Sequence, residues 1–179
     1  MHKPPKNAPA ATTFRFVPDA PEESVAADRA RMYREVIARV GLLLEGETDG
    51  VAAMATVVCE LHHGFAHYDW TGFYRVVGSE LVIGPYQGGH GCLRIRHGRG
   101  VCGAAWAEGK TQLVPDVRDF PGHIACSDTT LSEIVVPVKK PDGTVIAVLD
   151  VDSDQLAAFT DEDRTALEAL CDELGERFG

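Results

Sequence analysis

The chain has 179 residues, the size of one ordinary domain, and its shares of 45% apolar and 25% charged residues are those of a soluble globular protein. No apolar run approaches the roughly 18 residues needed to span a membrane, and the first residues lack the apolar segment of a signal peptide, so we expect a cytoplasmic protein. The formal net charge of −10 argues against nucleic acid or an anionic membrane as the main partner.

Residues 1–22 are rich in proline and alanine and show little periodicity, which predicts a flexible tail. Residues 23–179 are predicted to form a single domain, because apolar residues recur with regular spacing from Val25 onward.

Two helices are predicted after the tail. Apolar residues lie at helical spacing over residues 33–44 and again over residues 51–65. Gly46 is a typical end for the first helix, and Thr48 or Asp49 can cap the second by accepting hydrogen bonds from its first N–H groups.

Strand-like segments begin after the second helix. Residues 69–77 and 80–84 are separated by Gly-Ser and predict a hairpin. Residues 92–95 predict a further strand, and the glycine-bounded segment 98–109 predicts a short helix.

A second hairpin is predicted nearer the C-terminus. Residues 111–117 predict a strand that ends at a long loop, residues 118–132. Residues 133–140 and 144–153 predict two strands joined by a Pro-Asp-Gly turn.

The last predicted element is a helix whose start resembles a capping box, formed by Thr160 and Asp163, and whose apolar stripe includes Leu167, Leu170 and Leu174. The elements therefore follow in the order two helices, several hairpin-linked strands, a short helix, further strands and a final helix. This order favours an α+β domain with a mostly antiparallel sheet and helices gathered on one face.

The chain contains five cysteines, an odd number without any CxxC pair, which is typical of free thiols or ligands rather than of a disulfide framework. Cys59 and Cys171 lie on or beside apolar helical stripes, where a cysteine packs as a small hydrophobe. Cys92, Cys102 and Cys126 lie at the ends of elements, where a thiol can meet solvent or a ligand. Cys102 falls in the first turn of the short helix, where the helix dipole favours a thiolate.

Two chemistries fit three such cysteines. In thiol redox chemistry, one thiolate becomes a sulfenic acid by attacking an oxidised substrate, and a second thiol condenses with it to a disulfide. In the alternative, a zinc-stabilised interaction domain, the metal would be held by Cys92, Cys102, His123 and Cys126. The spacings disfavour zinc, because only His123 and Cys126 are close in the sequence.

Acidic and aromatic residues on two predicted strands indicate the lining of a site. Asp150 and Asp152 project from the same face at the end of a strand, where mutual repulsion and apolar surroundings raise the pKa of at least one carboxyl and suit it to proton donation. Trp70 and Tyr74 flank Gly72 on one face of another strand and can enclose a small apolar group. The alternative for Asp150 and Asp152 is a strand that ends in a solvated turn, and the alternative for Trp70 and Tyr74 is ordinary core packing.

Several segments together resemble the free methionine-R-sulfoxide reductases, which are built on the GAF fold. The resemblance covers about residues 30–178 and rests on DWTGFY, IGPYQG, CLRI with GVCG, HIACSD, SEIVVP and VLDVDS. It implies a GAF-like, six-stranded antiparallel sheet with helices packed mainly on one face, and usually a homodimer. It also implies that thioredoxin or a similar dithiol drives reduction of the R epimer of free methionine sulfoxide, without a metal or an organic cofactor.

The resemblance assigns a role to each of the three cysteines. Cys126 matches the cysteine that attacks the sulfoxide, and Cys92 matches the thiol that resolves the sulfenic acid. Cys102 matches a third thiol, which exchanges the disulfide onward or pairs with Cys92.

The resemblance also implies a substrate pocket. Glu133, Asp150 and Asp152 match the carboxylates that hold the amino group and protonate the sulfoxide oxygen, and Trp70 and Tyr74 match the aromatic residues around the S-methyl group. The main alternative is a GAF module that binds a small ligand as a sensor, although such a module would not need the three cysteines.

Overall fold

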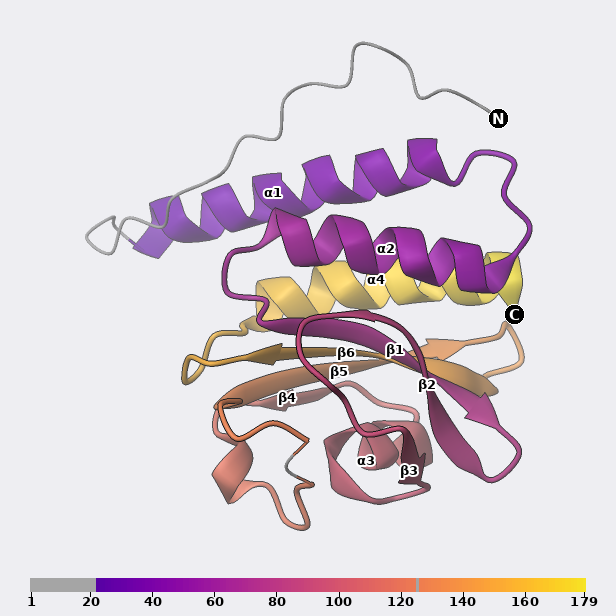
Figure 1. The fold of residues 1–179 in the computed structure, drawn as a ribbon. Coiled ribbons are helices and arrows are strands. Elements are labelled where there is room, and N and C mark those ends of the chain that lie inside the picture. The colour runs from indigo at the N-terminus through magenta and orange to yellow at the C-terminus, as the bar shows by residue number, and fades with distance from the viewer. Residues whose placement is uncertain (1–21, 125) are drawn as a thin grey trace.

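The structure is a computed structural model that describes residues 22–124 and 126–179 (Figure 1). Over these residues the elements are, in order, α1 (Glu22–Leu43), α2 (Gly50–Gly64), β1 (Trp70–Val77), β2 (Glu80–Gln87), β3 (Arg94–Arg96), α3 (Gly100–Glu108), β4 (Gln112–Val114), a 3₁₀ turn (Val117–Asp119), β5 (Ser132–Lys139), β6 (Val145–Ser153) and α4 (Asp161–Phe178). The predicted tail, residues 1–22, lies outside the described residues except for Glu22, where α1 begins.

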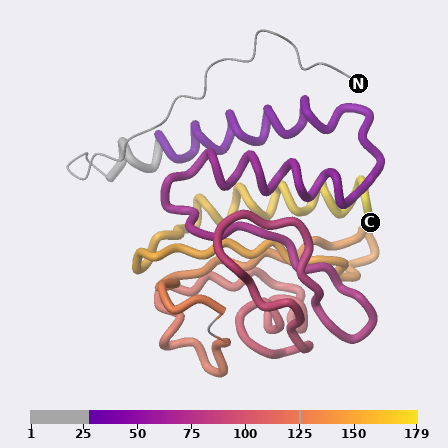
Figure 2. The backbone as a smooth tube through the Cα atoms, viewed as in Figure 1, coloured from indigo at the N-terminus to yellow at the C-terminus, as the bar shows by residue number. Residues whose placement is uncertain are grey.

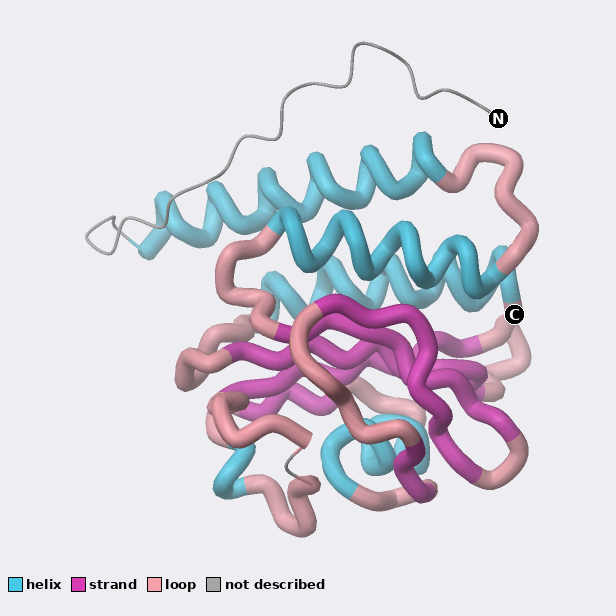
Figure 3. Tube along the Cα trace, in the orientation of Figure 1, coloured by secondary structure: helices cyan, strands magenta, loops and turns pink. Residues whose placement is uncertain are grey.

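The strands form one six-stranded antiparallel sheet in the order β3-β2-β1-β6-β5-β4. Both predicted hairpins are present, as β1–β2 and β5–β6. The helices α2 and α4 cover one face of the sheet, α1 packs over these two helices as an outer layer, and α3 lies on the opposite face beside β3 (Figures 1 and 3). The predicted α+β fold, a six-stranded antiparallel sheet with helices packed mainly on one face, is confirmed.

Each face of the sheet buries its own apolar cluster, since both faces are covered. The cluster beneath α1, α2 and α4 includes Phe65, Phe73 and Leu149. The cluster beneath α3 includes Tyr74 and Val148. Successive residues of β6 thus point to opposite faces, as the two-residue period of a strand requires.

The alternation along β6 breaks down at its first two residues. The sequence pattern predicts Val145 on the same face as Leu149 and Ile146 on the other face. In the structure, Val145 packs in the cluster beneath α3 and Ile146 in the opposite cluster. The pairing of β5 with β6 shifts its register between Val138 and Lys139. Such an irregularity reverses the alternation, so the residues of β6 that precede it face the opposite side of the sheet from the one predicted.

Local signals define the starts of two helices. Of the two predicted caps for α2, Asp49 is the one that acts, because its Oδ1 accepts hydrogen bonds from the N–H groups of Val51 and Ala52. The capping box of Thr160 and Asp163 is present at the start of α4. None of the described helices is both long enough and apolar enough to cross a membrane.

Two irregular connections lie on the α3 side of the sheet. Figure 2 shows both the connection from β2 to β3 and the connection from β4 to β5 on that side. The loops therefore lie over the strand surface on the face that carries α3, since α2 and α4 cover the other face.

Candidate active site

A pocket opens on the α3 side of the sheet. Its floor comes from β1, β5 and β6, and its walls come from α3 and from the connections that precede β3 and β5. The pocket is open to solvent, and the empty space in and above it amounts to about 530 Å³. All of the predicted site residues line it except Cys92, which is tied to it through a disulfide with Cys126.

Strand pairing places three carboxyl groups together on the floor of the pocket. Glu133 of β5 lies opposite Asp152 of β6, and Val135 lies opposite Asp150. Because side chains alternate between the two faces of a strand, Glu133, Asp150 and Asp152 all project to the α3 side. Glu133 and Asp150 are each only 6% exposed, and Asp152 is half-buried.

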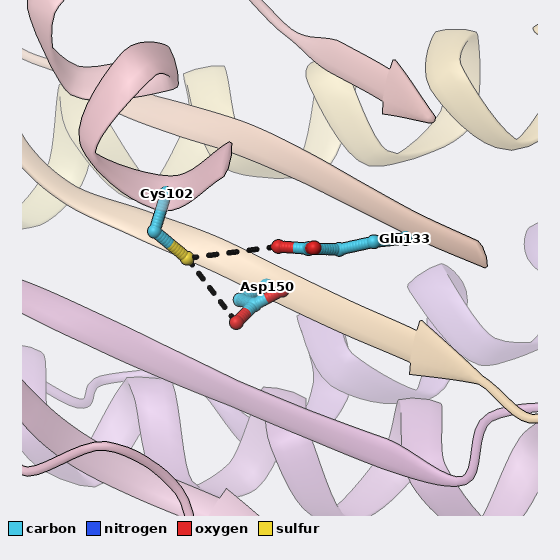
Figure 4. Close-up of side chains that lie close together, drawn as sticks. All are labelled: Cys102, Glu133 and Asp150. Atoms are coloured by element: carbon cyan, nitrogen blue, oxygen red, sulfur yellow. Dashed lines mark hydrogen bonds between the residues drawn. The ribbon is translucent and has the colours of Figure 1, made fainter. Parts of the chain in front are cut away.

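The Cys102 thiol points at two of these carboxyl groups (Figure 4). Its Sγ donates to Oδ2 of Asp150 at 3.2 Å and lies 4.0 Å from Oε1 of Glu133. Burial, together with the negative charges of Asp150 and Glu133, raises the pKa of Cys102 well above its usual value. The prediction of an accessible thiolate here is therefore wrong, because burial and two carboxyl groups outweigh the helix dipole.

Burial raises the pKa of all three floor carboxyls. The pKa of Asp150 rises to about 6, even though the hydrogen bond from Cys102 lowers it. The pKa values of Glu133 and Asp152 are also well above the usual range, because of burial and then the neighbouring carboxylate charges. No ion pair formed by the described residues includes any of the three. The predicted raised carboxyl pKa is confirmed, and the cluster holds its protons to a higher pH than free carboxyl groups do.

A disulfide joins Cys92 to Cys126 at the mouth of the pocket. The two Cα atoms lie 5.5 Å apart, although the residues are separated by 34 positions in the chain. The bond ties the β2–β3 connection to the loop that precedes β5. Cys126 is exposed and Cys92 is half-buried, so both lie at accessible ends of elements as predicted.

The remaining two cysteines lie away from the pocket. Cys171 is completely buried in the core beneath α4, as predicted. The prediction for Cys59 is wrong, because this residue is exposed and its Sγ lies 3.9 Å from Nδ1 of His63. Cys59 falls at the border of the buried face of α2, where helical periodicity alone does not separate a covered position from an open one.

Aromatic rings form one wall of the pocket, as predicted. The rings of Trp70 and Tyr74 stack with centroids 5.9 Å apart, and Tyr86 also stacks on Trp70 at 5.5 Å. The indole N–H of Trp70 donates to the carbonyl oxygen of Gly89 at 3.1 Å, which fixes the ring. A Cβ atom at Gly72 would overlap both the Trp70 ring and the Cβ of Tyr86. The missing side chain at Gly72 therefore sets the position of the wall.

Tyr86, His90 and Arg99 are among the residues at the pocket that were not predicted as site residues from the sequence. Tyr86 supports Trp70, while His90 and Arg99 line the pocket itself. Each of them lies within two positions of a glycine that borders a predicted element, which is the only sequence signal that points to them.

The described residues offer one group of donor atoms close enough together to hold a metal ion. Cys102, Glu133 and Asp150 each place a ligand atom within 4.8 Å of the other two. The zinc set considered from the sequence is not assembled, because Cys92 and Cys126 are bonded to each other.

Comparison with known families identifies the class of protein. A family model for the GAF domain matches residues 25–176. Because the match spans most of the chain, the chain belongs to the GAF domain family, and its six-stranded sheet with flanking helices is the GAF fold.

Individual relatives narrow the assignment. The chain is 39% identical over 147 residues to the free methionine-R-sulfoxide reductase of Escherichia coli, covering 82% of this chain and 88% of that protein. It is 47% identical over 140 residues to GAF domain-containing protein A of Dictyostelium discoideum, covering 78% and 87%. The X-ray structure of free methionine-R-sulfoxide reductase from Neisseria meningitidis in complex with its substrate superposes with a TM-score of 0.80 at 46% identity, covering 84% and 90%. The chain is a member of the free methionine-R-sulfoxide reductase family.

Proposed function

We propose that this chain reduces free methionine-(R)-sulfoxide to methionine, with Cys126 as the attacking thiol. The observation that carries this function is the Cys92–Cys126 disulfide at the mouth of a pocket floored by three carboxyl groups. Two thiols that close to a disulfide supply the two electrons that sulfoxide reduction needs, and carboxyl groups supply protons. The family supplies the identity of the substrate, since its members are named for this activity.

The reaction starts from the reduced protein. The Cys126 thiolate attacks the sulfoxide sulfur, the oxygen takes a proton from the carboxyl cluster, and methionine leaves while Cys126 becomes a sulfenic acid. The Cys92 thiol then attacks the sulfenic sulfur, water leaves, and the disulfide forms. Thioredoxin or a similar dithiol reduces that disulfide, so that each turnover consumes one dithiol and releases one water.

The floor carboxyls serve both ends of the substrate. A protonated carboxyl donates to the sulfoxide oxygen, and the raised pKa values keep such a proton available near neutral pH. An ionised carboxyl holds the ammonium group of the substrate. This group is the positively charged partner that Glu133, Asp150 and Asp152 do not have among the ion pairs of the described residues. Trp70 and Tyr74 contact the S-methyl group.

In this proposal Cys102 remains the third thiol, to which the disulfide can be transferred. In this structure it is a free, buried thiol that donates to Asp150, so it holds that carboxyl in position. Transfer of the disulfide onto Cys102 requires that the thiol leave this contact.

We also propose a homodimer located in the cytoplasm.

The reaction needs no metal or organic cofactor, since Cys92 and Cys126 supply both electrons.

An assay on both epimers of free methionine sulfoxide tests this function, with thioredoxin as reductant. We expect turnover of the R epimer, little turnover of the S epimer, and no turnover by Cys126→Ser. Cys59→Ser is the matched control, because Cys59 is exposed and lies outside the pocket. Absence of turnover of the free R epimer by the parent protein would contradict the function.

A further inference from the structure

The Cys102 sulfur and the carboxyl groups of Glu133 and Asp150 already have the spacing of metal ligands. The three side chains come from α3, β5 and β6 and point toward one another (Figure 4). Ligands at about 2.3 Å (sulfur) and about 2.1 Å (oxygen) from a tetrahedral zinc ion lie about 3.4–3.6 Å from one another. The Sγ atom lies 3.2 Å from Asp150 Oδ2 and 4.0 Å from Glu133 Oε1. The two distances from the sulfur are therefore within a few tenths of an ångström of those in a zinc site, and all three ligand atoms lie within 4.8 Å of one another.

A second observation shows that the cluster lacks a partner. Oδ1 of Asp150 is buried and has no partner among the hydrogen bonds of the described residues, although the Asp150 carboxyl lies within hydrogen-bonding reach of the Glu133 carboxyl, which belongs to the same cluster. The side chain is 6% exposed, so water does not surround this oxygen. A buried carboxyl oxygen without a partner is unfavourable unless a donor or a cation meets it.

The three floor carboxyl groups favour a cation over a neutral donor, because a cation can replace the protons that they hold. Glu133, Asp150 and Asp152 lie side by side, and none of them takes part in the ion pairs of the described residues. Two positively charged groups could fill this position: the ammonium group of an amino acid, or a metal ion.

We propose that Cys102, Glu133 and Asp150 form a site for a zinc-class divalent cation, and that the cation competes with the ammonium group of the substrate. A thiol with two carboxylates suits borderline ions such as Zn²⁺ and Co²⁺, whereas Mg²⁺ and Ca²⁺ prefer sets of oxygen ligands. Binding exchanges protons for the metal: the S–H bond of Cys102 and any O–H bond of Glu133 and Asp150 break, one S–metal and two O–metal bonds form, and the released protons pass to solvent. No oxidant or reductant is needed.

The site is complete while the enzyme is in its disulfide form. Cys102 is a free thiol in the same structure that joins Cys92 to Cys126. A metal ion can therefore hold the enzyme in an inhibited state without disturbing the redox pair. The competition with substrate rests on the proposed function, whereas the metal site itself does not.

Cobalt titration of the full chain in its disulfide form tests the site directly, because Co²⁺ bound to a thiolate gives a charge-transfer absorption band. The titration uses Cys59→Ser as the parent, since Cys59 lies near His63 and can bind metal separately. We expect the band to saturate at one Co²⁺ per chain and to disappear when Zn²⁺ is added. In that background, Cys102→Ser should abolish the band, and Asp150→Asn and Glu133→Gln should each weaken Co²⁺ affinity by about tenfold or more.

Cys171→Ser is the matched control, because it removes a buried thiol that lies outside the pocket. The band should persist in this variant, and circular dichroism checks that each variant is folded. A parent without the band, or a Cys102→Ser protein that retains it, would overturn the metal site.

A second titration tests the competition. Increasing free methionine should weaken the apparent Co²⁺ affinity, while an equal concentration of N-acetylmethionine, which lacks the ammonium group, should not. If methionine left the affinity for Co²⁺ unchanged, the proposal that the metal ion and the ammonium group occupy the same position would be overturned. Because neither titration requires turnover, an inactive protein that still binds Co²⁺ would contradict the proposed function and leave the metal site standing.

Discussion

Cys92 and Cys126 lie 34 positions apart in the chain and are joined by a disulfide whose Cα atoms are 5.5 Å apart. The bond closes the loop-built side of the pocket, since it ties the connection before β3 to the connection before β5. Reduction should therefore loosen this side of the pocket while leaving the sheet and the helices on its other face in place.

Reduction of the disulfide is expected to lower the free energy of unfolding. A cross-link over a loop of this length stabilises by up to about 4 kcal/mol in the chain-entropy model. Urea unfolding with and without a reducing agent measures the difference in the free energy of unfolding. This difference should be absent in Cys92→Ser, which cannot form the disulfide. Cys59→Ser should respond to reduction as the parent does. Equal stability of the oxidised and reduced parent would contradict this role of the disulfide.

Cys92→Ser should stop the reaction after the first half. This variant retains Cys126, so it should form one methionine per chain and accumulate a sulfenic acid that a dimedone probe traps and mass spectrometry locates at Cys126. Cys126→Ser should lose activity by about a thousandfold or more, because the nucleophile itself is gone. Methionine formation by Cys126→Ser at the parent's rate would show that another cysteine attacks.

The buried carboxyl of Asp150 should make stability fall as the pH rises. Its pKa in the folded protein is raised to about 6 from an ordinary value near 3.8, so the folded state holds its proton more tightly than the unfolded chain does. Below about pH 4 the group is protonated in both states, and the cost grows between about pH 4 and about pH 6. At about 1.4 kcal/mol for each pH unit between the two pKa values, the loss approaches about 3 kcal/mol.

Asp150→Asn should remove that loss. Urea unfolding should show the variant gaining stability over the parent above about pH 6 and matching it near pH 4. Asp172→Asn, at an exposed position of α4, is the control and should follow the parent at both pH values. An equal stability difference between Asp150→Asn and the parent at both pH values would mean that the carboxyl does not titrate in this window.

Gly72→Ala should damage substrate binding without unfolding the protein. The added methyl group would overlap the Trp70 ring and force the aromatic wall to move. A misplacement of this size is expected to lower kcat/KM by about 10- to 100-fold, mainly through KM. Gly41→Ala is the control, since a Cβ atom there meets nothing within 4 Å and the helix should tolerate it. Wild-type kinetics in Gly72→Ala would show that the Trp70 wall does not contact the substrate.

Much of the fold follows from periodic signals in the sequence. The two-residue alternation of β6 correctly places Asp150 and Asp152 on one face, where both line the pocket, and the capping box marks the start of α4. The alternation fails at Val145 because β6 carries one extra residue, Ile146, opposite the step from Val138 to Lys139 of β5, and the residue pattern of β6 does not signal this irregularity.

The environment of each cysteine was harder to predict. Burial of Cys102 depends on β5 and β6, which follow it in the chain and bring Glu133 and Asp150 to its sulfur. Exposure of Cys59 likewise depends on how the neighbouring elements cover α2. The sequence pattern left the disulfide pairing open, because the contact of Cys92 with Cys126 requires two loops to meet above a finished sheet.

Single turnover of the reduced protein tests the account most directly. The pre-reduced chain is mixed with one equivalent of free methionine-(R)-sulfoxide in the absence of any reductant, and the products are counted by mass spectrometry. We predict one methionine per chain and a new disulfide between Cys92 and Cys126, with Cys102 still free. If no methionine formed, or if the new disulfide included Cys102 in place of Cys126, the proposed roles of Cys126 and Cys92 would be contradicted.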